Sequence, residues 1–406
     1  MKKNELLTKD IRTLIKQIAI PSSIGMFFNT MYNVIDTFYV GMISTIAITA
    51  LSYSFMVFFM ILSISFGLSS AITALVGNSL GKHKHKLAQI FVINGMTFIA
   101  IVSTILCIVG FIFLPDIFNL LGAKDEALRL SLEYTNIILI GVVPMLLGLG
   151  ANAVLIAKGD TKSYRNTLMF GFFLNLLLNP LFIYGYSIIP AFGFAGVAYS
   201  TVLIQFITFF YIMFKLYKTN LFNFKIPKMF LPDKRIYKQL FTQALPMSLN
   251  MFIMSLGTML IMYFVSSYGY KTVAAFGIGY RVEQIILLPM LGLNTAVSAI
   301  VANNYGAKNF DRIFEVINKA LKYGFIMSLI GIVFLFFFGK VIIGFFDEDA
   351  EVIQTAYHYV MIESFIFFAF ITLFIANSVL QGIKRPFIIP YISVYRQLFM
   401  PFILLY

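Results

Sequence analysis

Polar side chains inside otherwise apolar segments are the residues of this chain whose types and spacing could do chemistry. The most informative of them is Asp36. Three polar residues precede it at spacings of seven, four and three, which share one helical face: Asn29, Tyr32 and Asn33. Because removal from water disfavours a charged carboxylate, Asp36 could hold a proton, or a sodium ion coordinated by neighbouring oxygens, and release it again. A structural, hydrogen-bonded aspartate near the end of its segment is the alternative.

A pair of amides forms a second polar feature. Asn175 and Asn179 lie one helical turn apart and are followed by Pro180. Amides at this spacing could complete a polar site with Asp36, or they could hydrogen-bond neighbouring helices together. The sequence leaves both interpretations open.

The second half of the chain carries its own intramembrane charges. Arg281 and Glu283 are two residues apart and so do not face each other on one helix. Each is expected to pair with another helix, with Glu363, Tyr359 or Arg396 as the available partners. A structural ion-pair role and a role in ion coupling are both possible for this network.

Catalytic motifs are missing from the sequence. Its three histidines are His83 and His85, which alternate with lysines, and His358. There is no His-Glu-x-x-His pair, no Gly-x-Ser-x-Gly elbow and no Gly-x-x-x-x-Gly-Lys-Ser/Thr phosphate loop. We therefore expect no enzymatic activity and no cofactor, and a transport process driven by an ion gradient, of H⁺ or Na⁺ if Asp36 binds the ion, or by a partner. An intramembrane enzyme is a further interpretation, for which the sequence offers no catalytic motif.

The elements that must position these residues are membrane-spanning helices. The hydrophobic set makes up 60% of the 406 residues, only 12% are charged, and the mean hydropathy is +0.90, which excludes an ordinary soluble or disordered chain. Crossing a bilayer takes about 20 mostly apolar residues. Eleven such runs are predicted near residues 15–40, 48–76, 87–114, 131–157, 166–189, 193–214, 240–267, 272–301, 320–345, 352–382 and 386–406.

The distribution of cations predicts the orientation. With the N-terminus in the cytoplasm, 24 of the 30 Lys and Arg fall on inner segments and only Lys124, Arg129, Lys271 and Lys340 on outer ones. The net charge of +13 is therefore a signature of topology, and no nucleic-acid partner is expected. Since Pro21 and polar residues interrupt the first run, a cleavable signal peptide is not predicted. We expect a multi-pass protein of a bacterial inner membrane.

An internal repeat defines the domains. One constant shift along the chain, which we call the repeat offset, aligns Pro21 with Pro246, Gly67 with Gly292, Asn78 with Asn303, Gly81 with Gly306 and Tyr134 with Tyr359, among others. Six spans per unit make this a parallel repeat. We predict an N-terminal lobe at 1–214, a basic cytoplasmic linker at 215–238 and a C-terminal lobe at 239–406. The counterpart of the sixth span would fall at 418–439, so a twelfth helix is missing and truncation is the favoured interpretation.

Several longer motifs carry a family resemblance along essentially the whole chain. They are Ala19-Ile20-Pro21, Asn33-Val34-Ile35-Asp36 through Val40-Gly41, Val76-Gly77-Asn78-Ser79-Leu80-Gly81 with its repeat Val301-Ala302-Asn303-Asn304-Tyr305-Gly306-Ala307, Asn175 through Gly185, and Gly196-Val197-Ala198. With these motifs the chain resembles the multidrug and toxic compound extrusion (MATE) transporters, and among them the bacterial members that rely on an aspartate of the N-terminal lobe.

The resemblance implies an all-α fold of twelve helices in two six-helix lobes, with a V-shaped central cavity. It implies export of organic cations against inflowing H⁺ or Na⁺, with Asp36 as the cation-binding residue. A second acid that many members carry matches Asn179, so a network of two carboxylates is not expected; Asn33, Asn175, Asn179, Tyr134 and Thr201 would surround Asp36 instead. Residues 246–267 contain no acid, which speaks against a sodium site on that helix.

The leading hypothesis is therefore a monomeric, cation-coupled antiporter for amphiphilic or cationic small molecules that works by alternating access in contact with membrane lipids. If it is sodium-coupled, Asp36 is the metal ligand. The alternative is a flippase or exporter of a lipid-linked saccharide or another amphiphile from the same superfamily.

Overall fold

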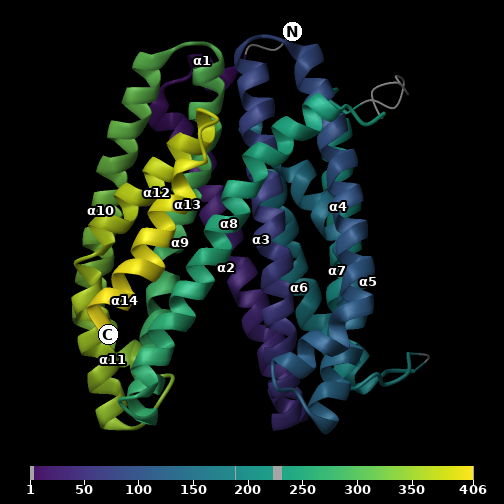
Figure 1. Ribbon diagram of the computed structural model, residues 1–406, viewed down its shortest axis with the longest axis vertical. Helices are drawn as coiled ribbons and strands as arrows, with labels where there is room; N and C mark the ends of the chain where they lie inside the picture. The colour runs from purple at the N-terminus through teal and green to yellow at the C-terminus, as the bar shows by residue number, and fades with distance from the viewer. Residues whose placement is uncertain (1–3, 188, 223–230, 406) are drawn as a thin grey trace.

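A computed structural model describes residues 4–187, 189–222 and 231–405 of the chain. The long helices run roughly along the vertical axis of Figure 1 and are, in chain order, α2 (Ile11–Ile43), α3 (Thr45–Gly81), α4 (His85–Leu120), α5 (Asp125–Ala157), α6 (Lys162–Tyr184), α7 (Phe194–Tyr217), α8 (Lys234–Ser266), α9 (Tyr270–Gly306) and α10 (Phe310–Gly344). The shorter ones are α1 (Glu5–Thr8), α11 (Ala350–Ser364), α12 (Phe367–Gly382), α13 (Ile388–Val394) and α14 (Met400–Leu405), with a π-helical turn at Tyr395–Phe399.

The predicted all-helical polytopic fold is confirmed. An isolated β-bridge between Tyr186 and Ile189 is the single β feature of the described residues. Within them, eight helices are long and apolar enough to cross a membrane, and a ninth span results if α11 and α12, bent by 53°, are counted together. All eleven predicted runs correspond to helical segments, but α2 and the segment Ile388–Leu404 fall outside that set. In α2 the reason is its polar content, to which Asn29, Asn33 and Asp36 contribute.

The ends of the predicted linker are helical. α7 continues to Tyr217 and α8 begins at Lys234, so the ordered helices extend into the range 215–238 from both sides. The Asp233 carboxylate caps α8 by accepting from the backbone N–H groups of Arg235 and Ile236. The central part of the predicted linker, residues 223–230, lies outside the described residues, as do Lys2 and Lys3.

The first long helix of each repeat packs into the core of the other repeat. At its start, α2 contributes Ile11, Ile15 and Ala19 to a buried cluster with residues of α9, α10 and α12. Reciprocally, α8 contributes Ile236, Leu240 and Ala244 to the core that α3, α4, α5 and α7 form. The repeat offset carries the first set of three onto the second. The two units are therefore interlocked at the end of the molecule that carries the N-terminus, which we call the N-terminal end.

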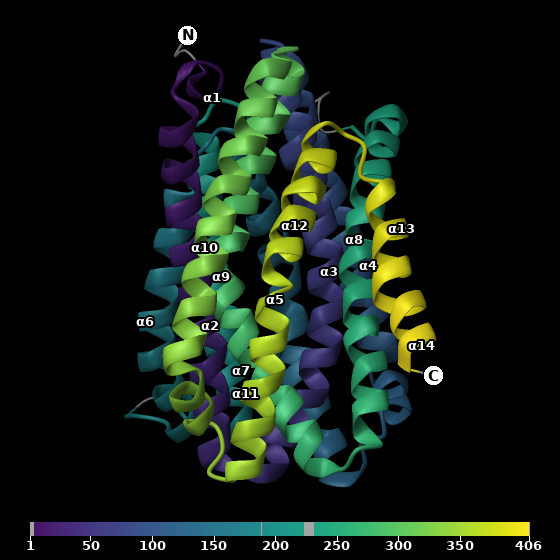
Figure 2. The same cartoon turned by 90° about the vertical axis from the view of Figure 1, so that its left-hand side faces the viewer.

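Glycines allow the closest approach between the two units. A β-carbon on Gly67 of α3 would lie 2.4 Å from the carbonyl oxygen of Ala244 in α8, and one on Gly292 of α9 would lie 2.5 Å from that of Ala19 in α2. Nearer the helix ends, a β-carbon on Gly81 would lie 1.9 Å from the carbonyl oxygen of Asn303. Figure 2 shows α3 and α8 side by side along this interface.

Paired asparagines reinforce the interface. Asn78 Nδ2 donates to the carbonyl oxygen of Gly382 in α12 at 2.9 Å, and Asn303 Nδ2 donates to that of Ala157 in α5 at 2.9 Å. The two donors are counterparts in the repeat and so are the two acceptors, which explains why the sequence repeats its Asn and Gly positions here. In Figure 1 the helices of the two units meet toward the N-terminal end, at the top, and diverge toward the opposite end.

Candidate functional site

Asp36 is buried inside the first repeat, where α2 packs against α6 and α7. The exposed fraction of its side chain is 4% although it lies within a predicted span. Asn179 Nδ2 donates to Asp36 Oδ1 at 2.8 Å and Asn175 Nδ2 donates to the same oxygen at 2.9 Å. The structure thus brings the amide pair of α6 to the carboxylate of α2, and the same bonds hold the two helices together, so the geometry fits both interpretations left open by the sequence.

The two amides are themselves held in place. Asn175 and Asn179 are fully buried and donate to each other's side-chain oxygens at 3.4 and 3.2 Å. Ser200 Oγ of α7 donates to Asn179 Oδ1. Because a buried amide is costly to leave unpaired, these contacts fix the orientation in which both amides present N–H groups to Asp36.

The second carboxylate oxygen is less fully bonded. Thr201 Oγ1 approaches Asp36 Oδ2 at 3.5 Å and accepts from Tyr32 OH at 3.1 Å. Tyr134 of α5 is buried within electrostatic range of Asp36 and stacks on Phe194, with ring centroids 5.1 Å apart. The geometry therefore leaves Oδ2 as the oxygen best able to receive a proton or a cation.

Asn33 is not part of this cluster. It is half-exposed, and its Nδ2 donates to the carbonyl oxygen of Asn29 at 2.9 Å. Residues three and four before Asp36 lie on opposite flanks of it around the helix, about 60° and 40° away. The packing of α7 covers the flank of Tyr32, so Tyr32 joins the cluster and Asn33 does not.

Ser200 is the residue of the cluster that sequence reasoning missed. It precedes Thr201 and lies one turn after Gly196-Val197 in α7, a segment singled out only as a motif. A hydroxyl beside a predicted site residue on an apolar helix is the signal that could have found it. Tyr32 was available from its spacing of four to Asp36.

The chemistry of this cluster suits a proton or a sodium ion. Among the described residues there is no group of three or more His, Cys, Asp or Glu side chains that could hold a transition metal. One carboxylate surrounded by neutral amide and hydroxyl oxygens is a ligand set for a hard monovalent cation, which takes oxygen ligands.

The acidic residues of the second repeat form a separate network. Glu283 is buried and faces Glu363 closely enough for the two carboxyl groups to share a hydrogen bond. Tyr359 lies beside Glu363, and Arg396 lies within electrostatic range of Glu283. Arg281, in contrast, has an exposed side chain and lies on the other side of α9. Four of the five predicted C-lobe residues are thus brought together, and Arg281 stands apart.

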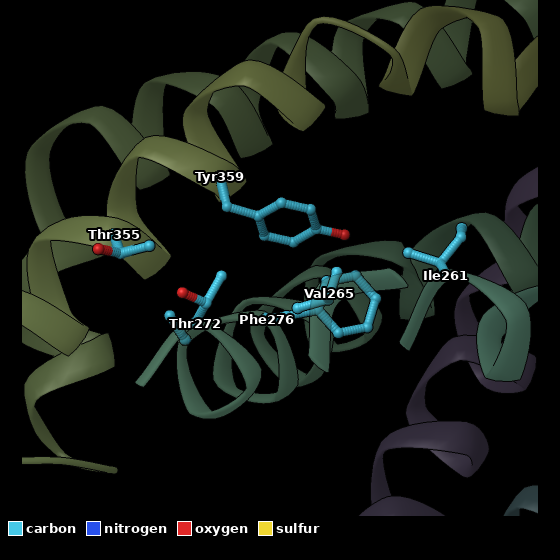
Figure 3. Close-up of a pocket in the computed structure, with 7 residues that line it drawn as sticks. Ile261, Val265, Thr272, Phe276, Thr355 and Tyr359 are labelled. Carbon is cyan, nitrogen blue, oxygen red and sulfur yellow. The ribbon is translucent and has the colours of Figure 1, made fainter. Parts of the chain in front are cut away.

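The region of the second repeat that corresponds to the Asp36 cluster is an apolar cavity. Under the repeat offset Ile261 is the counterpart of Asp36, and Tyr359 is the counterpart of Tyr134. Both line a cavity of about 160 Å³ between α8, α9 and α11, where Thr272, Phe276 and Thr355 also contribute (Figure 3). With isoleucine at the position of the aspartate, this cavity has no cation ligand of the Asp36 type, so the two repeats differ in chemistry.

Comparisons with known proteins agree with this architecture. The MatE family model matches residues 21–181 and again 246–406. The repeat offset relates the two matched segments at their first and at their last residues, so the family model recognises the same two units as the internal repeat.

Two individual relatives and one solved structure are similar to this chain over most of its length. The chain is 28% identical over 319 residues to the probable multidrug resistance protein YoeA of Bacillus subtilis, covering 78% of this chain and 69% of that protein. It is 26% identical over 363 residues to the FAD transporter of Shewanella oneidensis, covering 88% and 79%. A solved structure of a MOP superfamily transporter from Pyrococcus furiosus shares the fold, with a TM-score of 0.88 and 24% identity over 98% of this chain and 89% of that one.

Proposed function

This chain belongs to the MatE family of membrane transporters, and from that premise we propose that it exports small amphiphilic molecules in exchange for H⁺ or Na⁺ bound at Asp36. The family consists of transporters and not of enzymes. The relative named as a probable multidrug resistance protein supports export of foreign compounds as the biological role.

The observation that carries the proposal is the burial of a single carboxylate among oriented amides. A charged side chain at this depth is expensive and is retained where it serves an ion pathway. Asp36 Oδ1 accepts hydrogen bonds from two amide donors, and Oδ2 remains for the ion. The state with the ion bound at Oδ2 and the state without it would favour different arrangements of the two repeats. Such a difference is what coupled alternating access requires.

The proposal extends to orientation and assembly. The excess of Lys and Arg at the N-terminal end supports a cytoplasmic location for that end in a bacterial inner membrane. In the arrangement described above, the units are interlocked at this end and diverge at the other, as expected for an outward-open transporter. We propose that each monomer transports on its own.

Reconstituted vesicles test the proposed function. The purified chain is incorporated into liposomes loaded with ethidium or flavin adenine dinucleotide, and release is recorded after imposing a pH gradient at equal sodium or a sodium gradient at equal pH. We expect one of the two gradients to accelerate release of at least one probe. Release that responds to neither gradient would contradict ion-coupled export.

The amide donors should tune the affinity for the coupling ion. We expect Asn179→Ala to shift the ion concentration that gives half-maximal transport by roughly tenfold, because a hydrogen bond to a charged group contributes about 1.5–3 kcal/mol. Asn33→Ala is the matched control, since Asn33 bonds the backbone of its own helix. The shift is read from transport rates over a series of pH or sodium values. Equal shifts for both variants would argue against a role for the Asn179 contact.

A further inference from the structure

Arg281 is an unexplained charge in the second repeat. It lies in α9, three turns from the N-terminal residue of that helix, and its side chain is exposed. Within the described part of the chain it forms no hydrogen bond, ion pair or cation–π contact, in contrast to Lys271 of the same helix, which pairs with Asp349 and Glu351. An arginine at this depth is expensive unless it faces a polar partner or an aqueous space.

The helical geometry indicates which way Arg281 points. It precedes Gly292 by eleven residues, which is about three helical turns with a residual rotation of about 20°. Gly292 packs directly on α2 of the other repeat, whereas Gly279 on the far flank of α9 packs on Tyr359 and Val360 of its own repeat. The side chain of Arg281 therefore points toward the first repeat, on the part of α9 where the two units have diverged.

The surfaces that face this space are otherwise uncharged. Ser248 of α8 also lies at the Gly67 contact, and Ser23 of α2 at the Gly292 contact. Eleven residues from Gly67, Ser23 and Ser248, toward the end where the units diverge, lie Met56 on α3, Val34 on α2 and Met259 on α8, all of which are exposed. Neither α3 nor residues 246–266 of α8 carry a charged residue, and the carboxylate of α2 is turned into its own repeat.

The internal repeat shows that Arg281 has an uncharged counterpart in the first repeat. Met56 is the counterpart of Arg281 under the repeat offset. The inter-unit surface is thus nearly symmetric and uncharged, except that an arginine stands in the second repeat where the first repeat has a methionine. Packing alone would be satisfied by methionine on both sides, so the guanidinium is explained by something that it binds.

We propose that Arg281 binds an anionic group, a phosphate or a carboxylate, of the transported molecule, whose apolar part lies against the methionines. The planar guanidinium donates to such groups in a bidentate manner. The same charge repels organic cations. This inference rests on the proposed function and narrows its substrates to amphiphiles that carry an anion.

Binding of two flavins to the full chain in nanodiscs tests the inference. Flavin adenine dinucleotide and riboflavin share the fluorescent ring and differ in the pyrophosphate and adenosine. We expect the dinucleotide to bind at least about tenfold more tightly, and this preference to vanish in Arg281→Met and to survive in part in Arg281→Lys, as a charged hydrogen-bonded pair requires. Lys340→Met removes a cation of α10 and should leave the preference intact. Equal affinities in the wild type, or an unchanged preference in Arg281→Met, would overturn the inference.

Two further comparisons complete the test. One distinguishes a lipid headgroup from a soluble anion, and the other distinguishes failure of the proposed ion coupling from failure of the anion site. Displacement of the dinucleotide by polyprenyl phosphate in the nanodisc supports the anion site and identifies its ligand as a lipid headgroup; displacement by adenosine diphosphate but not by the lipid identifies a soluble anion. Binding requires no ion gradient. A defect in ion coupling would therefore abolish transport in every variant and leave the Arg281-dependent preference intact, whereas gradient-driven release without that preference would defeat only this inference.

Discussion

Replacement of Asp36 by asparagine is expected to abolish ion-coupled export while the protein still folds. Asparagine has almost the shape of aspartate, but it carries no charge and takes up no proton. We expect gradient-driven release from vesicles to fall by about two orders of magnitude, which corresponds to about 3 kcal/mol of lost ion binding. Because a buried carboxylate costs free energy in the folded state, the melting temperature should stay the same or rise.

The control for this variant is Asp116→Asn. Asp116 is exposed near the end of α4 and lies outside the Asp36 cluster, so the same chemical change should leave transport and melting temperature within error of the wild type. Undiminished coupled release by Asp36→Asn would remove Asp36 from the ion pathway, and loss of folded protein would assign it a structural role.

A methyl group on Gly81 or Gly306 should force the two repeats apart at the N-terminal end. The β-carbon of alanine at 81 would lie 1.9 Å from the carbonyl oxygen of Asn303, and at 306 it would lie 2.2 Å from that of Asn78. Since both neighbours are backbone atoms, no side chain can rotate away. Overpacking of this kind costs about 1–3 kcal/mol, so the population ratio between closed and separated N-terminal ends should shift by roughly tenfold or more.

Spin labels at Lys82 and Lys308, in a background in which Cys107 is replaced by alanine, would report this shift as a longer distance between the ends of α3 and α9. Transport should fall in parallel, and the two variants should behave alike because the contacts are reciprocal. Gly277→Ala on the same α9 is the control, since its β-carbon would meet no atom within 4 Å. If Gly81→Ala and Gly306→Ala match this control in distance and rate, the glycine contacts do not limit closure.

Much of the candidate site was accessible from residue types and spacing. Asp36, Asn175 and Asn179 were identified because polar groups inside an apolar helix must find partners, and they do find one another. The same reasoning wrongly included Asn33 in the site and missed Ser200. Whether a flank of α2 is covered depends on how α7 packs beside it, and helical spacing alone assigns Tyr32 and Asn33 equally well to the face of Asp36.

The same contrast holds for the second repeat. Periodicity correctly separated Arg281 from Glu283, but only the packing of α9 assigned Glu283 to a buried network with Glu363 and left Arg281 exposed. Likewise, hydropathy predicted one span at 352–382, while the structure bends it by 53° between α11 and α12.

By itself the sequence determined that this protein is a helical membrane protein built from two copies of one unit, because the length of its apolar runs and the constant offset between matching residues are properties of the chain alone. It also determined which side chains are too costly to bury without a purpose. The tertiary structure decided which of them meet, and that each unit inserts its first long helix into the core of the other. Such contacts join residues far apart in the chain, and their free energy depends on the orientation of whole helices, which local spacing does not specify.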